Sequence, residues 1–289
     1  QTGDATVQKS QKHDFKIVTI AQGFEHPWSL AFLPDDSYLV TERPGRLWRV
    51  FNSGQKVQVT GVPNVFNEGQ GGLLDITPEP NFKNSGFVYF SYAGEGSDGK
   101  ANTEVARAKL NLASNTLSDL EVIFKATPKV EGSNHWGSRL LFAPDGFLYI
   151  TLGERYDYKE EAQNPKNNLG TIVRLNPNGS VPKSNPFANG AQGHPSVFTY
   201  GNRNVQGIAV HPKTQEIWFH EHGPKGGDEI NKIIFGNNYS DEETLEKGNQ
   251  TWNYGRLTML DLYNDQLTSI PESIGNLSSL RYLEIDFNF

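Results

Sequence analysis

The 289-residue sequence contains no cysteine, which excludes disulfide bonds, a thiolate nucleophile and a cysteine-ligated metal. It also lacks a basic run. Its net charge is −7, so nucleic acid and anionic membranes are not expected partners. No apolar run approaches the roughly 18 residues that cross a bilayer. The remaining composition is globular, with 36% hydrophobic residues, and its 29 glycines and 16 prolines suit short strands joined by tight turns.

A repeated unit organises most of the chain. Each copy has a short apolar strand, a turn with proline and Asp, Asn or Lys, and a second strand with alternating side chains. The four copies begin at Pro27, Gly72, Gly137 and Gln206. Further strand candidates lie between the copies, at 46–50, 104–110 and 171–175. Two hairpins in each unit make a four-stranded sheet, and radial repetition of such sheets predicts an all-β fold of the β-propeller type.

The composition of the chain changes at both ends of this repeat region. We expect a flexible N-terminal segment over 1–13, a partial propeller over 14–239, a linker over 240–256 and a different unit over 257–289. The chain begins with Gln1 and a polar stretch. Removal of a signal peptide would explain this start and predicts a periplasmic or secreted protein, whereas an engineered start is the alternative.

The last segment resembles leucine-rich repeats. Leu257 and Leu260 are followed 23 positions later by Leu280 and Leu283. The match covers about one and a half repeats, and a solenoid needs about three units to bury its apolar face. We therefore expect this tail to pack on the propeller, to pair with another chain in self-association, or to stay poorly ordered. A fused or recombined gene is an alternative origin for it.

Four segments in a fixed order identify the repeat region with a known family. They read GQGGLLDITPEPNF, NHWGSRLLFAPDGFLYITLGER, YGNRNVQGIAV and EHGPKGGDEINKIIFGNNY. Together they resemble the PQQ-dependent soluble aldose dehydrogenases of the glucose/sorbosone type, which are six-bladed propellers. The resemblance spans about Phe15 to Tyr239. It implies oxidation of an aldose sugar at the anomeric carbon to the lactone, with hydride transfer to PQQ and an external electron acceptor.

The resemblance implies roles for five side chains. His135 corresponds to the general base, and an imidazole suits proton removal because its pKa lies near physiological pH. Glu154 stands where the family usually has an Asp that orients this base, so its reach is one methylene longer. Gln70, Arg203 and Asn204 correspond to cofactor-binding residues. Arg203 would also stabilise the charge that develops on the quinone oxygen during hydride transfer, which makes it a catalytic residue.

The resemblance also implies two calcium sites. Gly223 and Pro224 correspond to backbone carbonyl ligands of the calcium that binds the cofactor. Glu229 and the carbonyl of Tyr239 correspond to a second, structural calcium site. Calcium takes oxygen ligands of these kinds, and it can polarise a reacting carbonyl as a Lewis acid.

The family pattern ends after Tyr239. The family's last blades supply a Lys and further Arg residues to the cofactor, and no positions here match them. We therefore expect a propeller short by one to two blades, with part of the cationic wall of its cofactor site missing. Its open sheet edges would need a cover, for which the leucine-rich tail is a candidate. The alternative function is a non-catalytic propeller, a remnant or a fusion, that acts as a sugar-binding or protein-interaction module.

Overall fold

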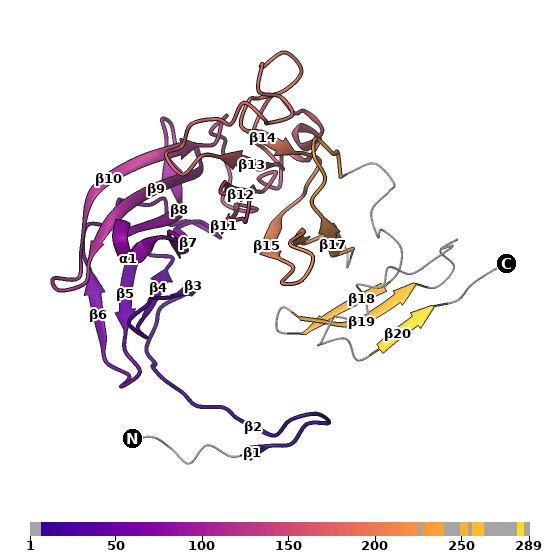
Figure 1. Ribbon diagram of the computed structural model, residues 1–289. Helices are drawn as coiled ribbons and strands as arrows, with labels where there is room; N and C mark the ends of the chain where they lie inside the picture. The colour runs from indigo at the N-terminus through magenta and orange to yellow at the C-terminus, as the bar shows by residue number, and fades with distance from the viewer. Residues whose placement is uncertain (1–6, 225–226, 240–248, 254–255, 263–281, 286–289) are drawn as a thin grey trace. The chain divides into compact units, whose positions relative to one another are not determined.

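Short strands joined by tight turns make up nearly all of the regular structure, as predicted (Figure 1). The computed structural model describes residues 7–224, 227–239, 249–253, 256–262 and 282–285. Within these residues the helices are the short α1 (Phe82–Ser85) and the 3-10 helix η1 (Lys159–Gln163). Neither is long and apolar enough to span a membrane. The chain divides into two compact units, one of residues 1–95 with 103–125 and one of 96–102 with 126–289.

The first unit holds two four-stranded antiparallel sheets in which neighbouring strands follow one another in sequence. The first sheet consists of β3 (Pro27–Phe32), β4 (Tyr38–Glu42), β5 (Arg46–Val50) and β6 (Lys56–Val59). The second consists of β7 (Leu73–Pro78), β8 (Phe87–Glu95), β9 (Ala101–Asn111) and β10 (Thr116–Lys125). Antiparallel neighbours need only a tight turn between them, and the Gly-, Pro- and Asp-rich turns of the repeat supply it.

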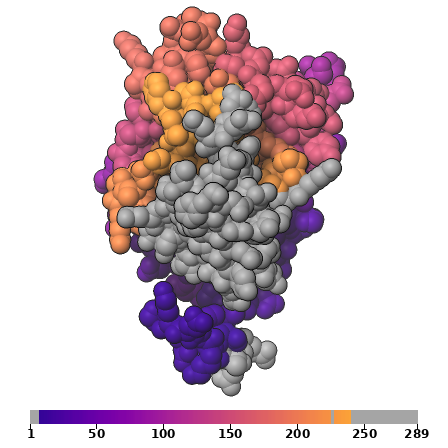
Figure 2. Space-filling model, turned by 90° about the vertical axis from the view of Figure 1, so that its right-hand side faces the viewer, coloured from indigo at the N-terminus to yellow at the C-terminus, as the bar shows by residue number. Residues whose placement is uncertain are grey.

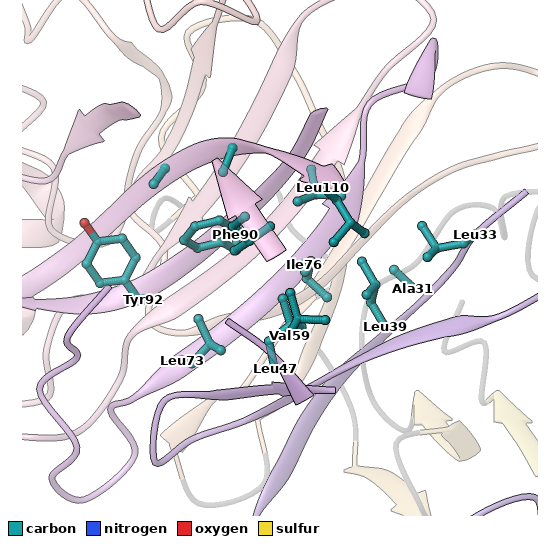
Figure 3. Close-up of a cluster of buried hydrophobic side chains, with 14 of the residues drawn as sticks. Ala31, Leu33, Leu39, Leu47, Val59, Leu73, Ile76, Phe90, Tyr92 and Leu110 are labelled. Atoms are coloured by element: carbon teal, nitrogen blue, oxygen red, sulfur yellow. The ribbon is translucent and has the colours of Figure 1, made fainter. Parts of the chain in front are cut away.

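Apolar side chains from these two sheets form the core of the first unit (Figure 3). The buried cluster includes Leu39, Leu47, Val59, Leu73, Ile76 and Phe90. Burial of each such side chain contributes about 1.5–3 kcal/mol. The Thr41 hydroxyl donates to the Leu74 carbonyl at 2.6 Å, so a hydrogen bond also joins the two sheets inside the core.

The second unit continues the same pattern. Its first sheet has β11 (Gly137–Phe142), β12 (Leu148–Leu152), β13 (Ile172–Leu175) and β14 (Val197–Thr199). Its second has β15 (Val205–Val210), β16 (Ile217–Glu221) and β17 (Glu229–Lys232). Tyr149, Phe198 and Phe219 belong to the buried cluster that joins these sheets. In the space-filling view, pink and orange atoms of this unit lie next to one another (Figure 2).

Each of the four sequence repeats supplies the leading strands of one of these sheets. The copy that begins at Pro27 forms β3 to β5, and the copy that begins at Gly137 forms β11 and β12. Strand order and pairing within each sheet are those of propeller blades, which confirms the all-β propeller prediction. The six-bladed type stays a prediction.

Strands also form near both ends of the described chain. β1 (Val7–Gln8) pairs with β2 (Phe15–Lys16). β18 (Asn249–Asn253), β19 (Arg256–Leu262) and β20 (Tyr282–Ile285) form a further sheet. The parallel pairing of β19 with β20 sets Leu260 opposite Leu283, which is the 23-residue offset of the predicted repeat. Residues 263–281 lie outside the described residues, so the leucine-rich repeat stays a prediction. Most of the predicted linker over 240–256 also lies outside them, so the linker stays a prediction too.

Gly72 marks a close approach of two backbone segments in the first unit. Its φ is 132°, and a Cβ atom there would lie 2.1 Å from the Arg43 carbonyl oxygen. Gly146 also has a positive φ, of 83°, but a Cβ there meets nothing within 4 Å. We expect Gly146→Ala to cost only the backbone strain of about 1–2 kcal/mol. Gly72→Ala adds an overpacking cost of about 1–3 kcal/mol. Urea unfolding of both variants measures the difference, and equal losses would contradict this account.

Candidate active site

His135 and Glu154 form a buried pair at one end of the sheet β11–β14. His135 lies two residues before β11, and Glu154 lies two residues after β12. Gly137 pairs with Leu152 across these antiparallel strands, so both side chains emerge at the same end. His135 Nδ1 lies 2.6 Å from Glu154 Oε2, and the side chains are only 8% and 3% exposed. A carboxylate that accepts from Nδ1–H fixes the tautomer in which Nε2 carries the lone pair of a base.

Glycine allows the two strand ends to approach this closely. A Cβ atom at Gly153 would lie 2.2 Å from the His135 carbonyl oxygen. At Gly137, where φ is 61°, a Cβ would lie 2.8 Å from the Leu152 backbone. His135 itself has a φ of 51°, a left-handed conformation that costs a non-glycine residue energy. The surrounding contacts must therefore hold His135 in this conformation.

Arg155 is the main such contact. Its side chain is fully buried, and it donates to the carbonyls of Asn134 at 3.0 Å, Ala101 at 2.6 Å and Gly132 at 2.5 Å. Its guanidinium carbon lies 3.4 Å from the centre of the Trp136 ring, within reach of a cation–π contact. Burial lowers the pKa of Arg155 to about 10, so the group stays charged at neutral pH. These hydrogen bonds fix the loop before β11, which carries His135. The sequence offered no signal for this role beyond its place next to Glu154.

The segment of Arg203 and Asn204 lies against the same loop. The Glu154 N–H donates to the Arg203 carbonyl at 2.9 Å. Asn204 Oδ1 accepts from the Gly137 N–H at 3.2 Å and from Gln206 Nε2 at 2.9 Å. The structure thus brings together four of the sequence-predicted residues, namely His135, Glu154, Arg203 and Asn204.

The buried Glu221 binds this segment through hydrogen bonds. Its carboxylate accepts from Asn202 Nδ2 at 3.0 Å, from the Asn204 N–H at 3.3 Å and from the Arg203 N–H. Burial, together with the charge of Glu229, raises the pKa of Glu221 to about 8. Sequence reasoning missed this residue. A signal was present, since strand alternation places Glu221 on the same buried face as Ile217 and Phe219.

The loop at Gly223 and Pro224 presents backbone carbonyl oxygens, the type of ligand that calcium accepts. Arg203 Nη1 donates to the carbonyls of His222 at 2.8 Å and of Gly223 at 3.3 Å, so these oxygens already face a positive group. A Cβ atom at Gly223 would lie 1.6 Å from the Gly227 carbonyl oxygen, so the turn requires glycine there. No cluster of three or more His, Asp or Glu side chains occurs among the described residues. A calcium ion here would depend on carbonyl ligands, which calcium accepts.

The other three predicted residues belong to other elements. Glu229 begins β17 and accepts from Asn231 Nδ2 at 3.0 Å. Tyr239 is buried, and its hydroxyl donates to the Lys232 carbonyl at 2.6 Å. Neither of these two hydrogen bonds links Glu229 to Tyr239, the two residues of the predicted structural calcium site. Gln70 lies in the loop before β7, in the first unit.

Comparison with known proteins shows which family the chain belongs to. The Glucose / Sorbosone dehydrogenase family model matches residues 24–248. The chain belongs to this family. It is 41% identical over 226 residues to the aldose sugar dehydrogenase YliI of Escherichia coli. This match covers 77% of this chain and 60% of YliI. The chain therefore spans about three fifths of the length of this curated relative.

Solved structures of the family have the same fold. A glucose dehydrogenase is 45% identical, with a TM-score of 0.74 over 77% of this chain and 70% of that one. The PQQ-bound aldose sugar dehydrogenase of Streptomyces coelicolor is 33% identical, with a TM-score of 0.69 over 80% of this chain and 66% of that one. The predicted family is confirmed, and the roles of individual site residues stay predictions.

Removal of the Arg155 side chain should destabilise this member of the dehydrogenase family. Arg155→Met leaves three backbone carbonyls without their donor, and each unpaired buried acceptor costs about 1–3 kcal/mol. We expect a loss of about 3 kcal/mol or more in urea unfolding. The matched control is Lys232→Met, which breaks an exposed pair with Glu216 and should cost under about 1 kcal/mol. Similar losses in the two variants would contradict the role given to Arg155.

Proposed function

We propose that this chain carries the base and part of the cofactor site of a PQQ- and calcium-dependent aldose dehydrogenase, which oxidises an aldose at the anomeric carbon to the lactone. The buried pair of His135 and Glu154 is the observation that carries the proposal, because its geometry suits proton removal. Family membership supports the sugar substrate class. The periplasmic or secreted location and the external electron acceptor belong to the same proposal.

His135 Nε2 accepts the proton of the anomeric hydroxyl. Glu154 holds Nδ1–H and stabilises the imidazolium that forms, and burial strengthens this interaction because water screens it little. The strained loop and the three hydrogen bonds from Arg155 to backbone carbonyls, here called the Arg155 clamp, keep the His135 ring in one orientation. PQQ, when bound, would supply the hydride acceptor, and calcium would supply a Lewis acid.

Gln70, Arg203 and Asn204 would hold the cofactor. Arg203 suits this role because its guanidinium is anchored on two carbonyls and places a positive charge beside the Gly223 loop. The carbonyls of Gly223 and Pro224 would ligate the calcium that binds the cofactor, and Glu229 with the Tyr239 carbonyl would form the structural site. The six-bladed closure of the family is part of this proposal as well.

Reconstitution tests the proposal directly. The protein is incubated with calcium and PQQ, and dye reduction is followed after addition of glucose or other aldoses. We expect PQQ binding at micromolar concentration and sugar-dependent reduction of the dye. Absence of PQQ binding would overturn the enzyme proposal and favour a non-catalytic propeller that binds sugar or protein.

His135→Ala should abolish turnover without releasing the cofactor. General bases contribute about 10²–10⁴-fold to rate, so kcat should fall by at least about 100-fold. PQQ affinity, followed by absorbance titration, should stay within about threefold of wild type. The control is His211→Ala, a histidine in the turn between β15 and β16, which should keep wild-type kcat. Loss of PQQ affinity in His135→Ala would assign the residue to cofactor binding instead.

Two substitutions of Glu154 separate charge from reach. Glu154→Gln removes the charge that stabilises the imidazolium, and kcat should fall by about 100-fold or more. Glu154→Asp keeps the charge and shortens the side chain, so it should retain more activity than Glu154→Gln. Steady-state rates over a range of glucose concentrations check the order. The opposite order would show that reach matters more than charge.

A further inference from the structure

An exposed aromatic ring stands beside the buried base. The Tyr156 side chain is 55% exposed, and its ring packs against His135 in an edge-on arrangement, with centroids 5.1 Å apart and planes at 79°. Aromatic rings of this size contribute to a fold mainly when they are buried. A ring left more than half in water gains little for folding from its position, so its place next to the base needs another explanation.

The backbone at Tyr156 is held in a costly conformation. Arg155 has a φ of 64° and Tyr156 a φ of 69°, and a left-handed non-glycine residue costs about 1–2 kcal/mol. The Tyr156 N–H donates at 3.0 Å to Glu154 Oε2, the same oxygen that contacts His135 Nδ1. Strain of this kind concentrates at functional sites, where neighbouring contacts maintain it. Here the Glu154 carboxylate and the Arg155 clamp maintain it, and they fix the ring relative to the base.

The chemistry of this pair of rings suits a sugar. The positive charge of an imidazolium would be compensated by Glu154, so the base does not call for a charged ligand. A pyranose is neutral and has an apolar face of C–H groups with hydroxyls at its edge. Binding sites combine aromatic walls with a few placed polar groups for such amphipathic molecules. Tyr156 supplies the aromatic wall and His135 the polar group.

We propose that Tyr156 is a substrate-binding residue whose ring supports the apolar face of the aldose while the anomeric hydroxyl faces His135. This inference rests on the proposed dehydrogenase function. The sugar contacts the face of the Tyr156 ring and not its phenol hydroxyl.

Substitutions at Tyr156 test the role of the ring. Tyr156→Ala should raise KM for glucose by about tenfold, which corresponds to ~1.4 kcal/mol of lost contact. Tyr156→Phe keeps the ring and should leave KM within about twofold of wild type. PQQ affinity should not change in either variant. Saturation-transfer NMR with glucose measures sugar binding without turnover, and the signal should weaken in Tyr156→Ala only.

Tyr158→Ala is the matched control, because it removes an aromatic ring from the same loop two residues further on. It should leave KM and the NMR signal near wild type. A tenfold rise in KM in this control would overturn the proposal, because the effect would then belong to the loop. Tyr156→Leu provides a second variant if Tyr156→Ala lowers the unfolding midpoint. Leucine keeps apolar bulk without the ring, and it should still raise KM.

The outcomes distinguish the two proposals. An active wild-type protein with unchanged KM and NMR signal in Tyr156→Ala would overturn the sugar contact and leave the dehydrogenase function standing. A wild-type protein that binds glucose through Tyr156 without any turnover would overturn the dehydrogenase function and support the sugar contact. Absence of a glucose signal in the wild-type protein with bound PQQ would overturn the contact.

Discussion

One carboxylate oxygen organises the candidate site. Glu154 Oε2 contacts both His135 Nδ1 and the Tyr156 N–H, so a single group sets the tautomer of His135 and the backbone of Tyr156. Because this oxygen is buried, its hydrogen bonds face little competition from water. Glu154 is itself placed by strand pairing and by its own N–H, which donates to Arg203. The sheet therefore positions the Glu154 carboxylate, and this carboxylate orients the His135 ring.

Two buried ionisable side chains lie near Glu154. Arg155 is a cation that is hydrogen-bonded to neutral carbonyls, while Glu221 is an acid whose pKa burial raises to about 8. Both groups act on backbone: Arg155 on the loop that carries His135, and Glu221 on the segment of Arg203 and Asn204. Two ionisable side chains thus stabilise the two loops that meet at Glu154. Such groups are costly to bury, and their hydrogen bonds offset part of that cost.

The sequence predicted the parts of the fold and site that depend on local pattern. Alternation and turn residues located β3 to β5 and β11 to β12. A four-segment motif paired His135 with Glu154, and the two side chains are in contact, while their roles stay predictions. Roles that depend on contacts across the fold were missed, because the acceptors of Arg155 come from Ala101, Gly132 and Asn134. Alternation also understated burial in β4, which is covered on both faces. The predicted site at Gln70 depends on a loop of the other unit, which a local pattern cannot position.

The three-carbonyl clamp of Arg155 has a consequence for the thermodynamics of substrate binding. A loop that must be ordered when its reactant arrives loses conformational entropy at that moment and weakens the affinity. Here the loop before β11 is already fixed by hydrogen bonds within the protein. Its ordering is completed during folding, where the stability of the whole sheet supports it. The contact energy of an incoming ligand is then available to orient the ligand itself against His135.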